Sequence, residues 1–183
     1  YHNLQDDINN KAKYTDIKES MRKWICLSLL KRVFGGQSDN VLTSIRKVLK
    51  NNNDINSFPI EQIKDEFKTN PAKNLSFDDD FIDGLLTTQK DDTNCYTILS
   101  LLYSHLNFNQ ELHKDHLHPA SYFNKLKPKD CPIEEDYNFY KDPKNWNSIA
   151  NLQLLNSSLN ESKLDTPLEQ WVKERNIDID NQL

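Results

Sequence analysis

A carboxylate stands next to an imidazole at Asp115 and His116, within the segment DHLHP at 115–119. Histidine is the usual general base near neutral pH, and a divalent cation held by oxygen ligands neutralises charge that develops on a reacting phosphate. Adjacent side chains of a strand point to opposite faces, so both groups can serve one site only if the strand ends or bends near Pro119. The segment therefore predicts half of a one-metal site for hydrolysing a phosphodiester.

The residues for the other half lie at 151–163. Asn151 precedes a short apolar strand, and its amide can accept a hydrogen bond from His116 and fix the tautomer of that ring. Asn160 follows after room for a turn and the start of a helix, and an amide oxygen is a suitable ligand for magnesium. Lys163 lies one helical turn beyond Asn160, where it can contact phosphate. A cap or turn role explains either asparagine alone, but the joint spacing is much more specific.

These motifs resemble the HNH (ββα-metal) nuclease signature in its His-Asn-Asn form, with DHLHP at 115–119, IANLQLL at 149–155 and NESK at 160–163. They are similar in particular to the C-terminal nuclease domain of GmrSD-like restriction proteins, which join it to a ParB/sulfiredoxin-like NTPase domain. The upstream segments KRVFGGQSDNVLTSIRKVL at 31–49 and YTILSLLYS at 96–104 also resemble the helical section that precedes that nuclease.

The resemblance assigns roles to the matched residues. It implies that His116 is the general base, that Asn151 orients His116, and that Lys163 lies near the phosphate. Asp115 and Asn160 would be the metal ligands. These roles describe an endonuclease that uses a histidine base and one divalent metal ion.

The expected ion is Mg²⁺, with Mn²⁺, Ni²⁺ and Zn²⁺ as alternatives, and His118 is an accessory candidate at the same site. A competing interpretation is a structural zinc site whose ligands would be His113, His116, His118 and Cys131. The spacing of those four residues fits no zinc-finger pattern. Four of the five histidines in the chain lie between His105 and His118. Such clustering of a rare residue is consistent with a metal or catalytic site, and also with an ordinary polar surface.

The resemblance implies a DNA endonuclease that restricts foreign, in some cases base-modified, phage DNA. Fold analogy alone does not establish such a role, and a non-cleaving module that binds nucleic acid or a partner is the alternative. The chain begins at Tyr1 without methionine, so we expect a C-terminal fragment whose NTPase domain lies before it. The resemblance leaves the oligomeric state undecided between monomer and homodimer, because a cut across both DNA strands needs two active sites or two successive binding events.

Composition sets the remaining limits. The chain has 183 residues, which suits one or two small domains, and a formal net charge of −5. An acidic total argues against a non-specific coat on nucleic acid, but not against an enzyme whose bound cation supplies positive charge. The three cysteines are far apart and form no CxxC pair, which favours reduced thiols in the cytoplasm. No apolar run is long enough to span a membrane.

Apolar periodicity predicts a mainly α fold, with a helical domain at 1–108 followed by a ββα-metal nuclease domain at 109–183. The helices expected in the first domain cover 16–34, 38–49, 58–67, 76–85 and 93–106. Leu42, Ile45 and Leu49 are expected to form the buried face of the second helix, and Tyr96, Leu99 and Tyr103 that of the fifth. The pair Gly35-Gly36 is expected to end the first helix.

The second predicted domain alternates strands and loops. Residues 111–118 are expected to be extended, and 152–155 to form a strand followed by a helix that Asn156 caps. Between the strands, 119–145 holds four of the seven prolines and is expected to be a long loop with a helical turn near 121–125. Its lysines could contact phosphate or simply be solvated: Lys125, Lys127, Lys129, Lys141 and Lys144. One more helix is expected after Thr166-Pro167.

Overall fold

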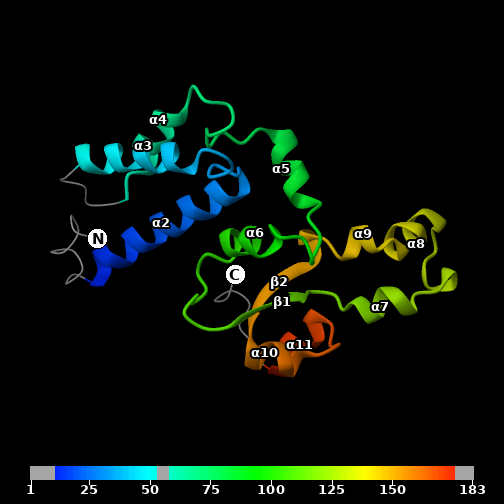
Figure 1. Ribbon diagram of the computed structural model, residues 1–183. Helices are drawn as coiled ribbons and strands as arrows, with labels where there is room; N and C mark the ends of the chain where they lie inside the picture. Colours follow the sequence, from blue (N-terminus) through cyan, green and yellow to red (C-terminus); the bar gives the residue numbers. More distant parts are fainter. Residues whose placement is uncertain (1–10, 53–57, 176–183) are drawn as a thin grey trace. The chain divides into compact units, whose positions relative to one another are not determined.

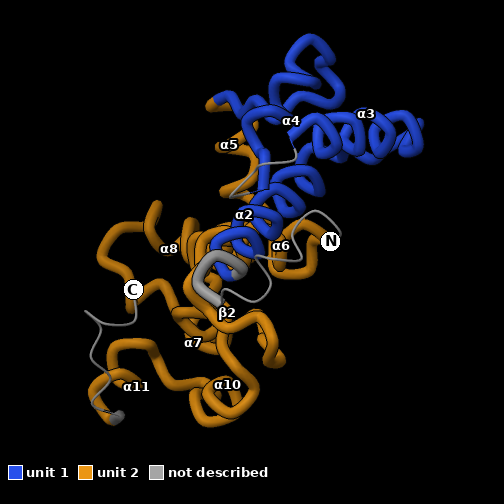
Figure 2. Tube along the Cα trace, turned by 90° about the vertical axis from the view of Figure 1, so that its left-hand side faces the viewer, with its two compact units in different colours: residues 1–78 blue, residues 79–183 orange. Residues whose placement is uncertain are grey.

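The computed structural model describes residues 11–52 and 58–175, without the side chains of 11–14 and 175. The chain divides into two compact units, 1–78 and 79–183 (Figure 2). Over the described residues the fold is mainly helical with one two-stranded sheet, as predicted. The units divide earlier than the predicted boundary after residue 108, because two helices expected in the first domain belong to the unit that holds the strands. None of the described helices has the length and apolar character that crossing a membrane requires.

The first unit contains three described helices, α2 (Lys11–Leu30), α3 (Ser38–Asn51) and α4 (Ile60–Phe67) (Figure 1). They enclose a hydrophobic core whose buried members come from all three helices and the segments beside them: Trp24, Val33, Val41, Ile45, Val48, Ile63, Phe67 and Leu75. The expected helix opened by Phe58-Pro59 is confirmed, and its apolar face points into this core. Residues 53–57, part of the expected loop before it, lie outside the described residues.

Two details of the first unit differ from the prediction. Helix α2 ends at Leu30, before the glycine pair, and the chain then turns through Gly36 at a left-handed φ of 59° that glycine adopts without penalty. Helix α3 buries Val41 and Val48, whereas Leu42 is 49% exposed. The sequence offers two overlapping apolar stripes on this helix, and its packing against α4 selects the β-branched one.

The second unit begins with α5 (Asp79–Leu86) and α6 (Cys95–Leu102). Helix α6 packs against the second strand and buries Cys95, Ile98 and Leu99. The predicted stripe on this helix is therefore wrong in part, because Leu99 is buried but Tyr96 is 40% exposed. No residue of α5 is fully buried, although Phe81 and Leu85 are half-buried.

The two strands, β1 (Leu112–His116) and β2 (Leu152–Asn156), pair antiparallel as a hairpin with a long insertion. Helix α10 (Ser157–Lys163) folds back over both strands, and the Asn156 side chain caps it by accepting a 2.9 Å hydrogen bond from the Leu159 N–H. Helix α11 (Leu168–Arg175) follows and buries Trp171. The expected order of strand, strand and helix is thus present. Asp115 and His116 are the last two residues of β1, and Asn160 and Lys163 lie on α10.

The expected loop at 119–145 is wrong, since most of this stretch is helical. It contains α7 (Ala120–Lys125), the 3₁₀ turn η2 (Pro128–Asp130), α8 (Glu134–Lys141) and α9 (Pro143–Trp146), and the turn η3 (Ile149–Asn151) follows before β2. The prolines do not interrupt these helices: Pro128 and Pro143 begin η2 and α9, where the first turn needs no N–H from proline, and Pro119 and Pro132 lie just before α7 and α8. The Asp142 side chain, for example, caps α9 at Pro143.

Candidate active site

Hydrogen bonds join the residues after β1 to the residues before β2, where the motif at 115–119 lies beside the motif at 149–155. The Leu117 N–H donates to the Asn151 carbonyl at 2.9 Å, which extends the pairing past β1. The Asn151 side-chain oxygen accepts from the His118 N–H at 2.8 Å. Its amide nitrogen donates to the carbonyls of His118 at 2.9 Å and Trp146 at 2.8 Å. Asn151 is only 7% exposed, so this buried amide fixes the turn that follows β1.

The imidazole of His116 contacts a different asparagine from the one predicted. Its Nε2 lies 2.9 Å from Oδ1 of Asn147, and the prediction that Asn151 holds this ring is wrong. An amide oxygen only accepts, so Nε2 carries the proton and Nδ1 keeps a free lone pair. Asn147 lies outside the recognised motifs, between the expected loop at 119–145 and the motif at 149–155, and no spacing in the sequence marks it.

The position of Asn147 is fixed by a segment far away in the sequence. The Lys90 N–H donates to the Asn147 carbonyl at 2.9 Å, and the Ile149 N–H donates to the Thr88 carbonyl at 2.9 Å. Helix α9, which ends at Trp146, delivers the residue from the other side. Residues 88–90 therefore lie against the approach to β2 and hold the partner of His116 in place.

The ring of His116 also lies against aromatic side chains. Its centroid is 5.8 Å from that of Trp146, which stacks at 5.6 Å and 2° on Phe123. Burial lowers the pKa of His116 from its ordinary 6.5, and the hydrogen bond to Asn147 opposes that shift in part. The Lys90 and Lys163 charges add to the lowering, while Asp115 opposes it. The imidazole is therefore neutral at pH 7.

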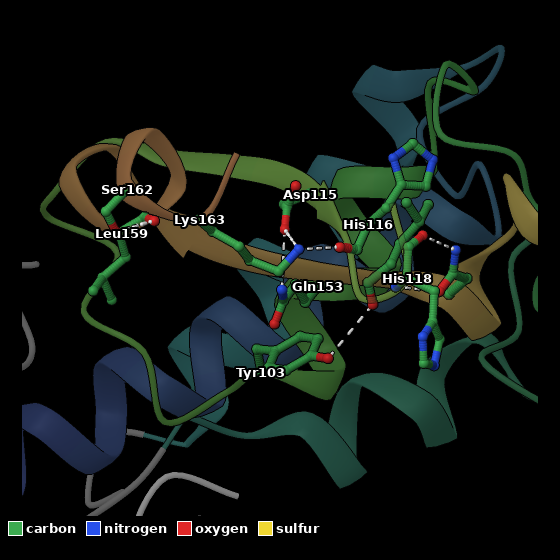
Figure 3. A network of polar contacts seen from close by, with 10 residues as sticks. Tyr103, Asp115, His116, His118, Gln153, Leu159, Ser162 and Lys163 are labelled. Atoms are coloured by element: carbon green, nitrogen blue, oxygen red, sulfur yellow. Dashed lines mark hydrogen bonds and ion pairs between the residues drawn. The ribbon is translucent and has the colours of Figure 1, made fainter. Parts of the chain in front are cut away.

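Asp115 is held on the other side of the strand by two polar side chains (Figure 3). The Lys163 ammonium lies 2.9 Å from Oδ2 of Asp115 and donates to the His116 carbonyl at 2.6 Å. The Gln153 amide donates to the same carboxylate oxygen at 3.1 Å. The Lys163 side chain is 1% exposed, so the predicted direct contact with phosphate is wrong, and Lys163 instead links the Asp115 side chain to the His116 backbone.

Asn160 lies on α10 one turn before Lys163, which places both residues on the face that packs on the strands. The Asn160 side chain is half-buried and hydrogen-bonds to none of the described residues. His118 is exposed, and its ring points away from that of His116 (Figure 3). The structure thus joins Asp115 to Lys163 directly and fixes the His118 backbone through Asn151, while the described residues show no hydrogen bond between Asn160 and Asp115.

Within the described part of the chain, no three side chains of histidine, cysteine, aspartate or glutamate gather as a metal-binding group. The four residues of the zinc interpretation accordingly form no cluster there, and His113 lies 3.4 Å from Glu111 instead. Amide oxygens such as that of Asn160 are a further kind of metal ligand, which these four residue types do not include.

No protein-family model matches this sequence. A search of curated proteins gives no significant match either.

Proposed function

We propose that this chain is a metal-dependent DNA endonuclease of the HNH type. The main support is the neutral imidazole of His116, which Asn147 orients through Nε2 at the end of β1. Asp115, the residue before it, points to the opposite face of the strand, where the buried Lys163 holds its carboxylate. Perturbed titration and a fixed orientation are together typical of a catalytic base. The arrangement follows the order of strand, strand and helix that the resemblance to HNH nucleases implies.

His116 acts as the base through Nδ1. Because Nε2 donates to Asn147, the lone pair of Nδ1 is available to take a proton from a water molecule. That water oxygen then attacks phosphorus, the bond from phosphorus to the 3′ oxygen breaks, and the departing oxygen takes a proton from solvent. The lowered pKa of His116 keeps the ring in the basic form at neutral pH. Asn147 therefore supplies the orienting hydrogen bond that we predicted for Asn151, and Asn151 positions the backbone of the neighbouring turn.

The residues fit a magnesium-like ion in their chemistry. Both contacts to the Asp115 carboxylate fall on Oδ2, which leaves Oδ1 for a cation, and the Asn160 amide is unengaged among the described residues. Magnesium takes few protein oxygens and fills its remaining positions with water and phosphate. When bound, such an ion would neutralise charge on the phosphate and stabilise the leaving oxygen. Lys163 and Gln153 would orient the ligand, as outer groups around metal sites do.

The biological role that we propose is restriction of foreign phage DNA, including base-modified DNA. An associated NTPase domain, as in the GmrSD-like proteins, would regulate the cut, and a homodimer would supply the second active centre. The support for this part is the resemblance of the motifs at 115–119 and 149–163 to the GmrSD-like family.

The test is a plasmid-cleavage assay with the purified chain, in magnesium and in EDTA, on plain, hydroxymethylated and glucosylated DNA. We expect magnesium-dependent nicks that leave 5′-phosphate ends. Asn160→Ala should raise the magnesium concentration for half-maximal cleavage by about tenfold or more, the usual effect of weakening a metal site. Glu161→Gln, on the same helix, should leave it unchanged. Cleavage that persists in EDTA, or an unchanged magnesium requirement in Asn160→Ala, would contradict the metal site.

A further inference from the structure

A cavity of about 370 Å³ lies within the helical insertion between the strands. Its lining comes from the turn after β1, from α7 and η2, and from α8, which lies beside α7. Its lining residues include His118, Tyr122, Phe123, Asp130, Asp136 and Tyr140. The cavity adjoins the proposed active site in two ways, because Asn151 holds the His118 backbone and Phe123 stacks on Trp146, the ring beside His116.

The walls of this cavity expose aromatic surface to solvent. Tyr122 is 58% exposed and Tyr140 is 44% exposed, whereas Phe123 between them is buried. Tyr122 meets Phe123 edge-on at 5.5 Å and 87°, and Tyr140 lies 6.3 Å from Phe123 at 32°. No planar group fits between rings this close, so the faces available for stacking belong to the two tyrosines. Stacking on an aromatic side chain is the usual way for a protein to hold an unstacked base.

The polar groups of the cavity select what can enter. Asp130 uses Oδ2 to accept from the Lys127 N–H at 2.9 Å, which leaves its other oxygen free to accept. Asp136 is exposed and hydrogen-bonds to none of the described residues. Carboxylates only accept, so they suit the exocyclic amino groups of cytosine, adenine and guanine. They repel phosphate and oppose the carbonyl oxygens of thymine.

The segment that borders the cavity carries charge of the opposite sign. Lys125 at the end of α7, Lys127 in the connection and Lys129 in η2 are all exposed. Their ammonium groups suit the phosphates on either side of a base whose amino group faces the two aspartates. A nucleotide strand would therefore meet positive charge along its backbone and negative charge at the base.

We propose that the cavity between α7 and α8 binds an unstacked, amino-bearing nucleobase of the DNA strand, in preference to thymine, with cytosine and adenine as its probes. The inference rests on the proposed function, since a base in this cavity would belong to the strand presented to His116. Stacking on Tyr140 and Tyr122 supplies affinity, and Asp130 and Asp136 supply the preference between bases.

The test measures binding without cleavage. Fluorescence anisotropy of the wild-type chain in EDTA is recorded with labelled homopolymers of dC, dA and dT, each about ten nucleotides long. We expect dC and dA to bind about tenfold tighter than dT. Tyr140→Ala should weaken dC binding by about tenfold, the loss expected for one stacked base, and Tyr140→Phe should retain it. Asp136→Asn should bring dT within about threefold of dC, because the repulsion between acceptors is removed.

Tyr96→Ala is the matched control, because Tyr96 is a 40% exposed tyrosine on α6 that does not line the cavity. It should bind dC as the wild type does. If Tyr140→Ala does not fold, Tyr122→Ala carries the same test. Equal affinity for the three homopolymers, no measurable binding, or equal losses in the cavity variant and Tyr96→Ala would overturn the inference.

A parallel plasmid-cleavage assay in magnesium separates this inference from the proposed function. Preference for dC and dA without any cleavage would reject the nuclease and leave a nucleobase site. Cleavage without that preference would reject the cavity as a base site and leave the nuclease.

Discussion

The two units of this chain are built on different interiors. The hydrophobic core cluster belongs to the first unit, where helices α2, α3 and α4 bury apolar side chains such as Ile63. The second unit also buries apolar side chains such as Leu152 and Leu154, but η3, β2 and α10 bury polar ones as well: Asn151, Gln153 and Lys163, at 7%, 7% and 1% exposure. Each of these three side chains is hydrogen-bonded or ion-paired to one or more of residues 115–118, at the end of β1 and just after it.

The three buried polar side chains of the second unit carry a cost in stability that the apolar core of the first unit does not. Burying apolar groups stabilises a fold with little geometric demand. A buried charge or amide destabilises it unless every partner is in place. Such groups hold side chains in one arrangement, and here the arrangement includes the proposed base. The first unit is therefore interpreted as scaffold and the strand end of the second as the site.

The largest effect is expected from Lys163→Met. Removal of the ammonium leaves the Asp115 carboxylate without its 2.9 Å partner and with a side chain only 15% exposed. Loss of one partner of a buried ion pair costs about 3–5 kcal/mol. Urea unfolding monitored by circular dichroism measures the change, and cleavage should disappear. The control is Lys64→Met, whose 2.8 Å pair with Glu61 is exposed and should contribute about 1 kcal/mol or less. Equal destabilisation by the two variants would remove the contrast between the units.

Ile63→Ala tests the scaffold with a perturbation of similar size. Ile63 is 1% exposed in the core of the first unit, and truncation of a buried isoleucine costs about 2–5 kcal/mol. The free energy of unfolding should fall by that amount, while the cleavage rate per folded molecule should stay at the wild-type value. Cleavage that falls as steeply as in Lys163→Met would show that the first unit also shapes the site.

Asn147→Leu sharpens the assignment of the orienting residue. Without the acceptor 2.9 Å from Nε2, the His116 ring loses its fixed tautomer, and the cleavage rate should fall by about tenfold to a hundredfold. Asn147→Asp keeps an acceptor, so it should retain the orientation and shift the pH profile of cleavage to higher pH. Asn138→Ala, on exposed α8, is the control. An unchanged rate in Asn147→Leu would mean that the hydrogen bond does not serve the base.

The smallest effect concerns the titration of His116 in the metal-free protein. NMR should place the pKa of this ring below 6.5, chiefly because it is buried. The unfolded chain then binds more protons than the folded chain between that pKa and 6.5, so the free energy of unfolding falls as the pH falls through this window. Asn147→Leu should lower the pKa further, since the lost hydrogen bond had raised it. A pKa above 6.5 in the folded wild type would contradict the burial of this ring.

Local patterns in the sequence predicted the elements of the site. The strand at 152–155 and the helix capped by Asn156 follow from a short apolar run and a capping residue, and both are present. Of the helices in 119–145, the turn expected near 121–125 is present as α7, but α8 and α9 were missed, because prolines that begin a helix look the same in sequence as prolines that break one.

Contacts made at long range could not be predicted in the same way. Asn147 became the partner of His116 because residues 88–90 hold the chain there. The burial of Lys163 depends on a carboxylate forty-eight positions earlier in the chain (163 − 115). Neither pairing leaves a spacing that a single sequence reveals.

The most direct test of the central claim, that His116 takes the proton from water, is single-turnover cleavage of DNA in magnesium by His116→Ala. The account predicts a rate about a hundredfold to ten-thousandfold below wild type, with DNA and magnesium affinities within about twofold of it, and wild-type cleavage by His105→Ala. His105 is exposed and belongs to neither motif. A His116→Ala rate equal to that of His105→Ala would contradict it.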